Sequence, residues 1–254
     1  MKKIFKKLLF IFFLAFFISI SYYFIFPDVS SLKKKNPKKT SFMEYREKEW
    51  ERQKKRIKIR QIWVPLSNIS PYLIKAVLIA EDDKFWHHEG FDFEAIQKAM
   101  DKNIKQGRFK SGGSTISQQL SKNLYLTPSK NPIRKLKEAI LTWRIERNLS
   151  KKRILEIYLN VAEWGEGIFG IEAASRHYYG KSASALSPEE SCRLASVLPN
   201  PRRYNPVGNS GYVEKRSSII YNIMVKRGVV VPEYEDVIDA TEETIKEETD
   251  QSQQ

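Results

Sequence analysis

The stretch Gly112–Leu124 reads GGSTISQQLSKNL and guides the interpretation of the whole chain. Two glycines lead into apolar residues that recur every four positions, at Ile116, Leu120 and Leu124. This spacing predicts an α-helix with one buried stripe, whose first turn offers free backbone N–H groups to an anion. A second, polar set also recurs every four positions: Ser114, Gln118 and Lys122. An ordinary amphipathic helix explains the stripe but not a polar face made of hydroxyl and amide groups.

Helical signals dominate the rest of the body as well. Proline or capping residues predict helix starts at Pro71, Asn131-Pro132, Ser150 and Ser187-Pro188, and apolar spacing predicts helices near residues 93–104 and 211–227. Strand patterns are few, with one short apolar piece at Ile62–Pro65, and no βαβ alternation occurs. The sequence therefore predicts a mainly α domain.

The N-terminus carries an apolar run, Leu8–Phe26, of 19 residues without a charge. At about 1.5 Å per residue, a helix of this length nearly matches a hydrocarbon core of roughly 30 Å. No convincing cleavage site follows, which favours an uncleaved transmembrane anchor. Lysines flank the run on both sides, so charge alone leaves its orientation open.

Charge divides the chain unevenly. The segment Glu233–Gln254 holds nine acidic residues and one lysine, so the remainder stands at +22 against +14 for the whole chain. Such a basic body predicts an anionic partner, whether nucleic acid, lipid headgroups or a phosphate-bearing substrate. The predicted organisation is an anchor (1–27), a charged linker and solvated helical stalk (28–60), a catalytic domain (61–228) and an acidic disordered tail (229–254).

The segment Glu81–Gly90 reads EDDKFWHHEG and follows a predicted helix. Glu81 at the helix end, against Phe85 and Trp86, would have the raised pKa that suits a general base. Surface acids on a terminal turn remain the alternative. The adjacent histidines lack zinc-ligand spacing, so a hydrogen-bonded, structural His88 is favoured. The single cysteine, Cys192, reads as a small buried residue.

The segment Arg134–Glu138 reads RKLKE. Arg134 and Glu138 are four residues apart, so a plain helix salt bridge explains them. A second carboxylate inside a cationic patch explains them equally well.

Taken in order, these segments resemble the glycosyltransferase domain of peptidoglycan polymerases, glycosyltransferase family fifty-one. The matching motifs are E-D-x-x-F-x-x-H-x-G (81–90), G-G-S-T-I-S-Q-Q-L-x-K-N-L (112–124), R-K-x-K-E (134–138) and I-L-E-x-Y-L-N (154–160). The resemblance covers Ile62–Pro206, and residues 211–224 also resemble the monofunctional, biosynthetic members of the family.

The resemblance implies a lysozyme-like, mainly α fold with a large lobe and a small, mobile, membrane-facing lobe. Phe91–Lys110 would form the small lobe, with Phe109 suited to insertion at an anionic interface. It also implies a bacterial cytoplasmic-membrane protein, crossing once, with its catalytic domain on the outer, periplasmic side. The expected partners are lipid II, the growing glycan chain, membrane lipids and other cell-wall synthesis proteins, but no nucleic acid.

The implied reaction joins lipid II units into β-1,4-linked glycan, inverts the donor sugar and releases undecaprenyl diphosphate. By resemblance Glu81 is the general base, Glu138 the second carboxylate, and Lys122 a diphosphate contact. Lys130 stands where the family often has Arg, which weakens bidentate recognition. The other substrate contacts implied are Asp82, Phe85, His88, Ser114, Thr115, Gln118, Asn123, Arg134 and Lys135.

No motif requires a cofactor. Mg²⁺ or Mn²⁺ at the donor diphosphate fits the reaction, although the sequence contains no dedicated metal ligands. The residues after Pro206 hold no K-T-G motif, so we expect glycan polymerisation without peptide cross-linking.

Two rival functions remain. A lysozyme-like lytic hydrolase needs one catalytic Glu and no cationic diphosphate site, so Lys122, Lys130 and Arg134 count against it. A non-enzymatic basic membrane scaffold explains the charge and the anchor, but not the helix that follows Gly113.

Overall fold

The computed structural model describes residues 2–106, 112–129 and 131–231. Helices make up most of this part of the chain, which confirms the prediction of a mainly α protein. The α-helices are α1 (Lys2–Ile25), α2 (Ser41–Arg52), α3 (Pro71–Glu81), α4 (Phe93–Gln106), α5 (Ile116–Tyr125), α6 (Pro132–Asn148), α7 (Lys151–Val161), α8 (Ile171–Tyr179), α9 (Pro188–Val197) and α10 (Gly211–Lys226). Short 3₁₀ turns lie at Ser30–Lys33, Leu66–Asn68, Phe85–His87 and Ala183–Ala185.

A small sheet closes one side of the body. Its strands β1 (Arg60–Gln61), β2 (Glu163–Gly165) and β3 (Ile168–Phe169) lie in the order β1-β3-β2. β1 runs parallel to β3, and β2 runs antiparallel to it. The predicted extended piece Ile62–Pro65 comes directly after β1. Gly170 leaves the sheet with φ +80°, where a Cβ would lie 2.7 Å from the carbonyl oxygen of Asn160, so this turn requires glycine.

Local capping sets most helix starts where the sequence predicts them. The side chains of Asn131 and Ser150 accept hydrogen bonds from Ile133 N and Arg153 N. Ser187 and Glu190 form the predicted capping box of α9. These bonds join residues two or three positions apart, so they form regardless of tertiary context.

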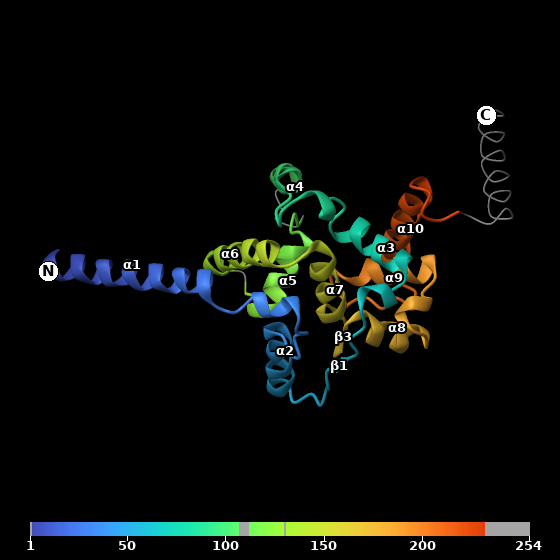
Figure 1. Cartoon of the computed structure of the whole chain (residues 1–254), viewed down its shortest axis with the longest axis horizontal. Helices are drawn as coiled ribbons and strands as arrows, with labels where there is room; N and C mark the ends of the chain where they lie inside the picture. The colour runs from blue at the N-terminus through green and yellow to red at the C-terminus, as the bar shows by residue number, and fades with distance from the viewer. Residues whose placement is uncertain (1, 107–111, 130, 232–254) are drawn as a thin grey trace.

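The core lies between α3, α5, α7 and α9, with α10 packed on α3 and α9 (Figure 1). The stripe Ile116, Leu120 and Leu124 is buried, as its spacing predicts. Cys192 is also buried, and burial raises the pKa of its thiol to about 12. This confirms the prediction of a structural rather than a reactive cysteine.

The structure corrects the prediction of a solvated linker and stalk over residues 28–60. Val29 and Leu32 are buried, and so are Met43 and Trp50 on α2. Met43 and Trp50 are seven residues apart and therefore share one helix face, which packs on the body while the charges occupy the rest of the surface. Arg46 Nη2 also pairs with the buried Glu163 at 2.7 Å.

We predict that Trp50→Ala lowers the free energy of unfolding by about 3–5 kcal/mol, because it removes a fully buried indole. Lys48→Ala, on the exposed face of the same helix, should stay within about 0.5 kcal/mol of wild type. Denaturant unfolding of the full chain in detergent measures both. Equal unfolding midpoints for the two variants would instead support the prediction that this segment is a solvated stalk.

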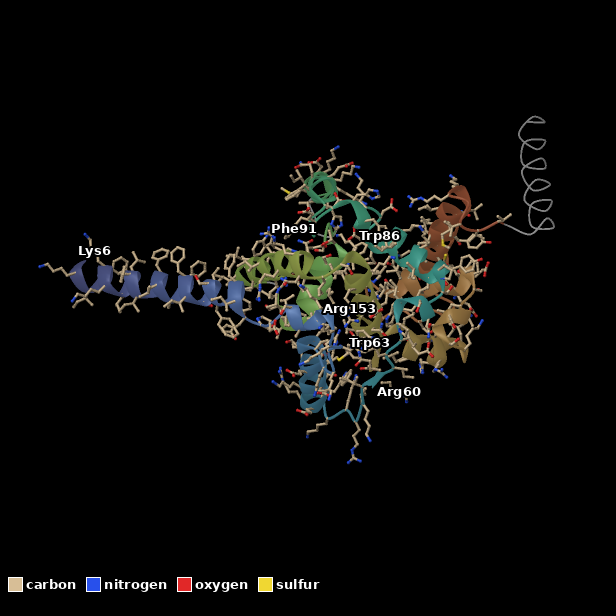
Figure 2. The ribbon with its side chains drawn as sticks, viewed as in Figure 1. Lys6, Arg60, Trp63, Trp86, Phe91 and Arg153 are labelled. Atoms are coloured by element: carbon tan, nitrogen blue, oxygen red, sulfur yellow. The ribbon has the colours of Figure 1, made fainter. Side chains whose placement is uncertain are left out.

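Helix α1 projects away from the body (Figure 1) and carries Lys6 near its free end (Figure 2). In the part of the chain that the structure describes, it is the one helix long and apolar enough to cross a membrane. Its phenylalanine, leucine and isoleucine side chains are largely exposed. This agrees with the predicted anchor.

Helix α4 lies within the segment predicted to form a membrane-facing lobe. Its apolar side chains Phe93, Met100 and Ile104 are 77%, 52% and 73% exposed. Phe109 lies outside the described residues.

Candidate active site

Glu81 is the last residue of α3, as predicted, and its carboxylate is almost enclosed. Gln119 Nε2 donates to one carboxylate oxygen at 2.9 Å, and Arg216 Nη2 approaches the other at 3.3 Å. Tyr158 donates to Gln119 Oε1 at 3.0 Å and so orients that amide. Burial raises the pKa of Glu81, while Gln119, Arg216 and Lys122 oppose the rise. Glu81 is therefore a carboxylate with strengthened basicity.

Gln119 and Arg216 are not among the site residues predicted from the sequence. Gln119 lies inside the quoted GGSTISQQL stretch, one position after Gln118, and so on a different face of α5. Arg216 comes from α10, which is separated from Glu81 by 135 residues. Only the packing of α10 on α3 brings it to the site.

Asp82 joins neighbouring segments of the fold and also lines a hollow beside Glu81. It is buried, and its carboxylate accepts from the backbone N of Ile116 at 2.9 Å and meets His88 Nε2 at 2.9 Å. Gly90 N donates to His88 Nδ1, so the imidazole proton sits on Nε2 and is donated to Asp82. This confirms the predicted hydrogen-bonded, structural His88, while the substrate contacts predicted for Asp82 and His88 stay predictions.

Phe85 belongs to the hydrophobic core. Its side chain is fully buried in the core, with Lys151 Nζ 4.6 Å from the ring centroid. The first motif thus places Glu81 and Asp82 at one hollow and turns Phe85 into the core.

The start of α5 is closed by its own side chains. Thr115 and Gln118 form a capping box, and the Thr115 hydroxyl also donates to Gly90 O at 2.7 Å. The anion site expected at these N–H groups is therefore largely occupied from within the chain, although Gln118 still lines a small cavity beside Ser114 and Lys135. Thr115 is a helix cap that also lines a hollow beside Glu81, so its predicted substrate contact stays a prediction.

A second row of polar side chains on α5, beside the predicted set Ser114, Gln118 and Lys122, is buried against α6. Ser117 donates to Glu146, and the Ser121 hydroxyl lies 2.8 Å from the Thr142 hydroxyl. Asn123 is 7% exposed, and its predicted substrate contact stays a prediction. The hydroxyl groups of Ser117 and Ser121 join two helices, whereas Ser114 lines the hollows.

Both explanations of the RKLKE segment hold at once. Glu138 is 3% exposed and pairs with Arg134 and Lys135 on its own helix. Lys135 Nζ also lies 3.4 Å from the Ser114 hydroxyl, which links α6 to the loop before α5. Glu138 is thus a buried carboxylate that holds two cations at the cleft.

Lys122 faces this cluster from α5. Burial lowers the pKa of Lys122, with Arg134 and Lys135 adding to the effect, whereas Glu138 and Glu81 oppose it. Both carboxylates therefore act on one ammonium. Among the described residues no carboxylate pairs with Lys122, so its charge is available to an anionic ligand. Lys130 lies outside the described residues.

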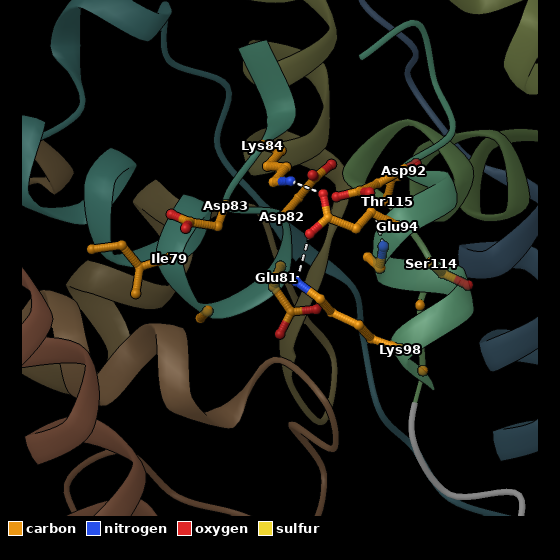
Figure 3. A pocket seen from close by; sticks show the side chains of 14 residues that line it. Ile79, Glu81, Asp82, Asp83, Lys84, Asp92, Glu94, Lys98, Ser114 and Thr115 are labelled. Carbon is orange, nitrogen blue, oxygen red and sulfur yellow. Dashed lines mark hydrogen bonds and ion pairs between the residues drawn. The ribbon is translucent and has the colours of Figure 1, made fainter. Parts of the chain in front are cut away.

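Two hollows meet at Glu81, with volumes of about 300 and 670 Å³. Lys98 and Ser114 line both, while Tyr212 and Arg216 close the larger one. Figure 3 shows Glu94 pairing with Lys84 and Lys98 at the rim of the smaller hollow. These two lysines lower the pKa of Glu94 to about 2. On the α4 side of the cleft, Lys84 and Lys98 are thus already paired with Glu94.

Comparison with known proteins identifies the family. The family model described as Transglycosylase matches residues 48–225, which include every element around Glu81. The chain belongs to the transglycosylase family. A biosynthetic peptidoglycan transglycosylase of Nitrosospira multiformis is 47% identical over 221 residues, 87% of this chain and 96% of the relative. The counterparts in Dechloromonas aromatica and Aromatoleum aromaticum are 53% and 56% identical, over 73% and 66% of this chain and 80% and 74% of theirs.

Family membership makes this chain a glycosyl-transferring enzyme, as the motifs indicate. The matched region begins at Lys48, inside α2, so the transglycosylase domain takes in part of the segment predicted as a stalk. The burial of Trp50 explains why: the second half of α2 packs as part of the domain.

Proposed function

We propose that this chain polymerises lipid II into β-1,4-linked peptidoglycan glycan strands and releases undecaprenyl diphosphate. The names of the relatives support the peptidoglycan substrate. The observation that carries the proposal is an enclosed, basic carboxylate at Glu81 close enough to the Lys122 ammonium for each group to shift the other's pKa. Among the described residues, no carboxylate forms a salt bridge with Lys122.

In the proposed step, the 4-hydroxyl of the acceptor attacks C1 of the donor sugar while Glu81 takes the hydroxyl proton. The bond from C1 to the diphosphate oxygen breaks, and the diphosphate leaves with the electron pair. A single displacement inverts C1, so the α-linked donor becomes a β-1,4 linkage. Gln119 and Arg216 orient the Glu81 carboxylate for this transfer.

The leaving diphosphate needs charge stabilisation more than protonation. Lys122 supplies an unpaired positive charge, and Arg134 and Lys135 are held at the cleft by Glu138. Lys130 is proposed to add to this cluster. Mg²⁺ or Mn²⁺ at the diphosphate remains part of the proposal; among the described residues no group of three or more His, Cys, Asp or Glu is placed to hold a metal. Such an ion would have to rest mainly on the substrate's own oxygens.

We further propose that α1 holds the enzyme in the cytoplasmic membrane with the catalytic domain on the outer, periplasmic side, where the lipid-linked donor is exposed. We expect this chain to polymerise glycan without cross-linking peptides. Other cell-wall synthesis proteins are its expected partners.

The experiment is polymerisation of labelled lipid II by the full chain in detergent, with and without Mg²⁺ or Mn²⁺. We expect lysozyme-sensitive polymer from wild type. For Lys122→Met we expect a rate about 10²-fold lower, because the variant lacks one positive charge that stabilises the leaving diphosphate. Lys152→Met is the matched control, since Lys152 is exposed on α7 away from the cleft.

Each alternative has its own outcome. Cleavage of preformed glycan without polymer would establish the lytic hydrolase. Neither reaction under any metal condition would establish the non-enzymatic scaffold. Equal loss in both lysine variants would reject the specific role of Lys122.

A further inference from the structure

Helix α6 has a second face, opposite Arg134, Lys135 and Glu138, and this face contacts the end of α1. Arg144 donates to the carbonyl oxygens of Tyr23 at 3.0 Å and Ile25 at 2.7 Å. These carbonyls belong to the last turn of α1 and have no partner within that helix. One guanidinium of the catalytic domain therefore caps the candidate membrane helix.

Aromatic contacts extend this junction. Phe24 meets Trp143 edge-on with 6.3 Å between ring centroids, and Lys137 Nζ lies 4.8 Å from the Tyr23 ring centroid. The Arg147 guanidinium lies over the Trp143 ring, 5.1 Å from the ring centroid. The end of α1 is thus held against α6 at several points, not joined to it by a loose linker.

The same face of α6 leaves large apolar side chains in the open. Ile133, Leu136 and Trp143 are 41%, 44% and 43% exposed. Helical geometry places them in one stripe with Lys137 and Arg147, whereas Glu138 and Glu146 lie on the inward side. A mixture of tryptophan, aliphatic and cationic side chains without acids is typical of a helix at a membrane–water interface.

Lysines surround the same junction from the segment after α1. Lys33, Lys34, Lys35 and Lys38 are exposed. Arg153 fixes this segment by donating to Leu32 O at 2.9 Å, Lys35 O at 3.0 Å and Asn36 Oδ1 at 2.7 Å. Figure 2 places Arg153 on the body close to the start of α2. The lysines are therefore held beside the exit of α1.

We propose that these two groups form one surface, the collar, that binds anionic phospholipid headgroups around α1. The collar consists of Ile133, Leu136, Lys137, Trp143 and Arg147 of α6 with Lys33, Lys34, Lys35 and Lys38. Its apolar side chains insert at headgroup depth, and its cations pair with lipid phosphates. This rests on α1 crossing a membrane, as proposed above, but not on the reaction. Since the other face of α6 carries Arg134, Lys135 and Glu138, the collar sets the height of the diphosphate site above the bilayer.

The first test measures whether the Trp143 side chain reaches the acyl chains of the bilayer. The full chain is reconstituted in phosphatidylcholine vesicles containing phosphatidylglycerol with brominated acyl chains, and quenching of tryptophan fluorescence is recorded. Trp143→Phe should remove most of the quenched emission, because phenylalanine keeps the contact with Phe24 but does not contribute to the tryptophan fluorescence. Trp86→Phe is the matched control: Trp86 is also 43% exposed, but it lies well away from α1 (Figure 2). Equal quenching in the two variants would overturn the proposal.

The second test measures whether the collar prefers anionic to zwitterionic lipid. Quenching of wild type by brominated phosphatidylglycerol should exceed that by brominated phosphatidylcholine by about threefold. Replacing Lys33, Lys34, Lys35 and Lys38 by Gln together should remove this preference, and so should high salt. A preference unchanged in the Gln variant would overturn the cationic part of the collar. Resistance to alkaline extraction reports insertion of α1 separately, and lipid II polymerisation in detergent reports the reaction separately.

Discussion

Replacing Glu81 by Gln is expected to lower the rate of glycan polymerisation by about 10²–10⁴-fold, the usual contribution of a positioned general base. The amide has nearly the same shape as the carboxylate and keeps an oxygen for Gln119, so the fold should survive. It cannot accept the proton of the attacking hydroxyl. Polymerisation of labelled lipid II, with a denaturant midpoint close to that of wild type, measures this effect.

Glu89→Gln is the matched control, since Glu89 is an exposed acid in the same segment. It should keep nearly full activity. Comparable losses in both variants would mean that the segment needs negative charge in general. Full activity in Glu81→Gln would remove Glu81 as the base.

The environment of Glu81 also predicts the pH dependence of the reaction. Burial raises the pKa of this carboxyl above its ordinary 4.5, and only the deprotonated form is a base. The rate should therefore fall as pH drops through a pKa higher than 4.5. Arg216→Gln removes a cation that opposes the rise, so it should move the acidic limb to still higher pH. An acidic limb at or below 4.5, or one that moves down in this variant, would contradict the assignment.

The second large effect is expected on stability. Asp82→Ala should lower the free energy of unfolding by roughly 2–6 kcal/mol, because the buried donors Ile116 N and His88 Nε2 each lose a partner at about 1–3 kcal/mol. The same bonds hold the start of α5 against the end of α3. Polymerisation should therefore fall as well, although Asp82 is buried.

Two further variants make this prediction specific. Asp82→Asn keeps one carbonyl acceptor and should recover about half of the lost free energy. Asp83→Ala, the adjacent residue, breaks only an exposed pair with Arg227 and should cost no more than about 1 kcal/mol. Denaturant unfolding in detergent compares all three. If Asp82→Ala unfolds like Asp83→Ala, the link between α3 and α5 contributes little.

The sequence by itself determined the features that depend on neighbours a few residues apart. Asn131, Ser150 and the Ser187–Glu190 box start their helices through bonds that span two or three positions. The stripe at Ile116, Leu120 and Leu124 is buried because helical periodicity puts the three side chains on one face. The apolar run of α1 is equally local, and the ordered motifs indicated the family before any geometry was known.

Only the tertiary structure decided which way the polar side chains point. Asp82, His88 and Thr115 stand in the motifs like site residues, and in the fold their side chains also join α3, the following loop and α5. Conversely, Arg216 reaches Glu81 across 135 residues. A pattern along the chain cannot distinguish a polar side chain that faces substrate from one that joins two helices, because both choices have the same local spacing.

The segment after α1 shows the same limit at larger scale. Its charge pattern describes a solvated stalk, yet Trp50 is buried and Arg153 and Arg144 bind backbone carbonyls more than a hundred residues earlier in the chain. Burial is decided by the partner surface that the rest of the fold supplies. The sequence therefore determined which residues can do the chemistry, and long-range packing decided which of them reach the cleft and how firmly the cleft is held to the membrane helix.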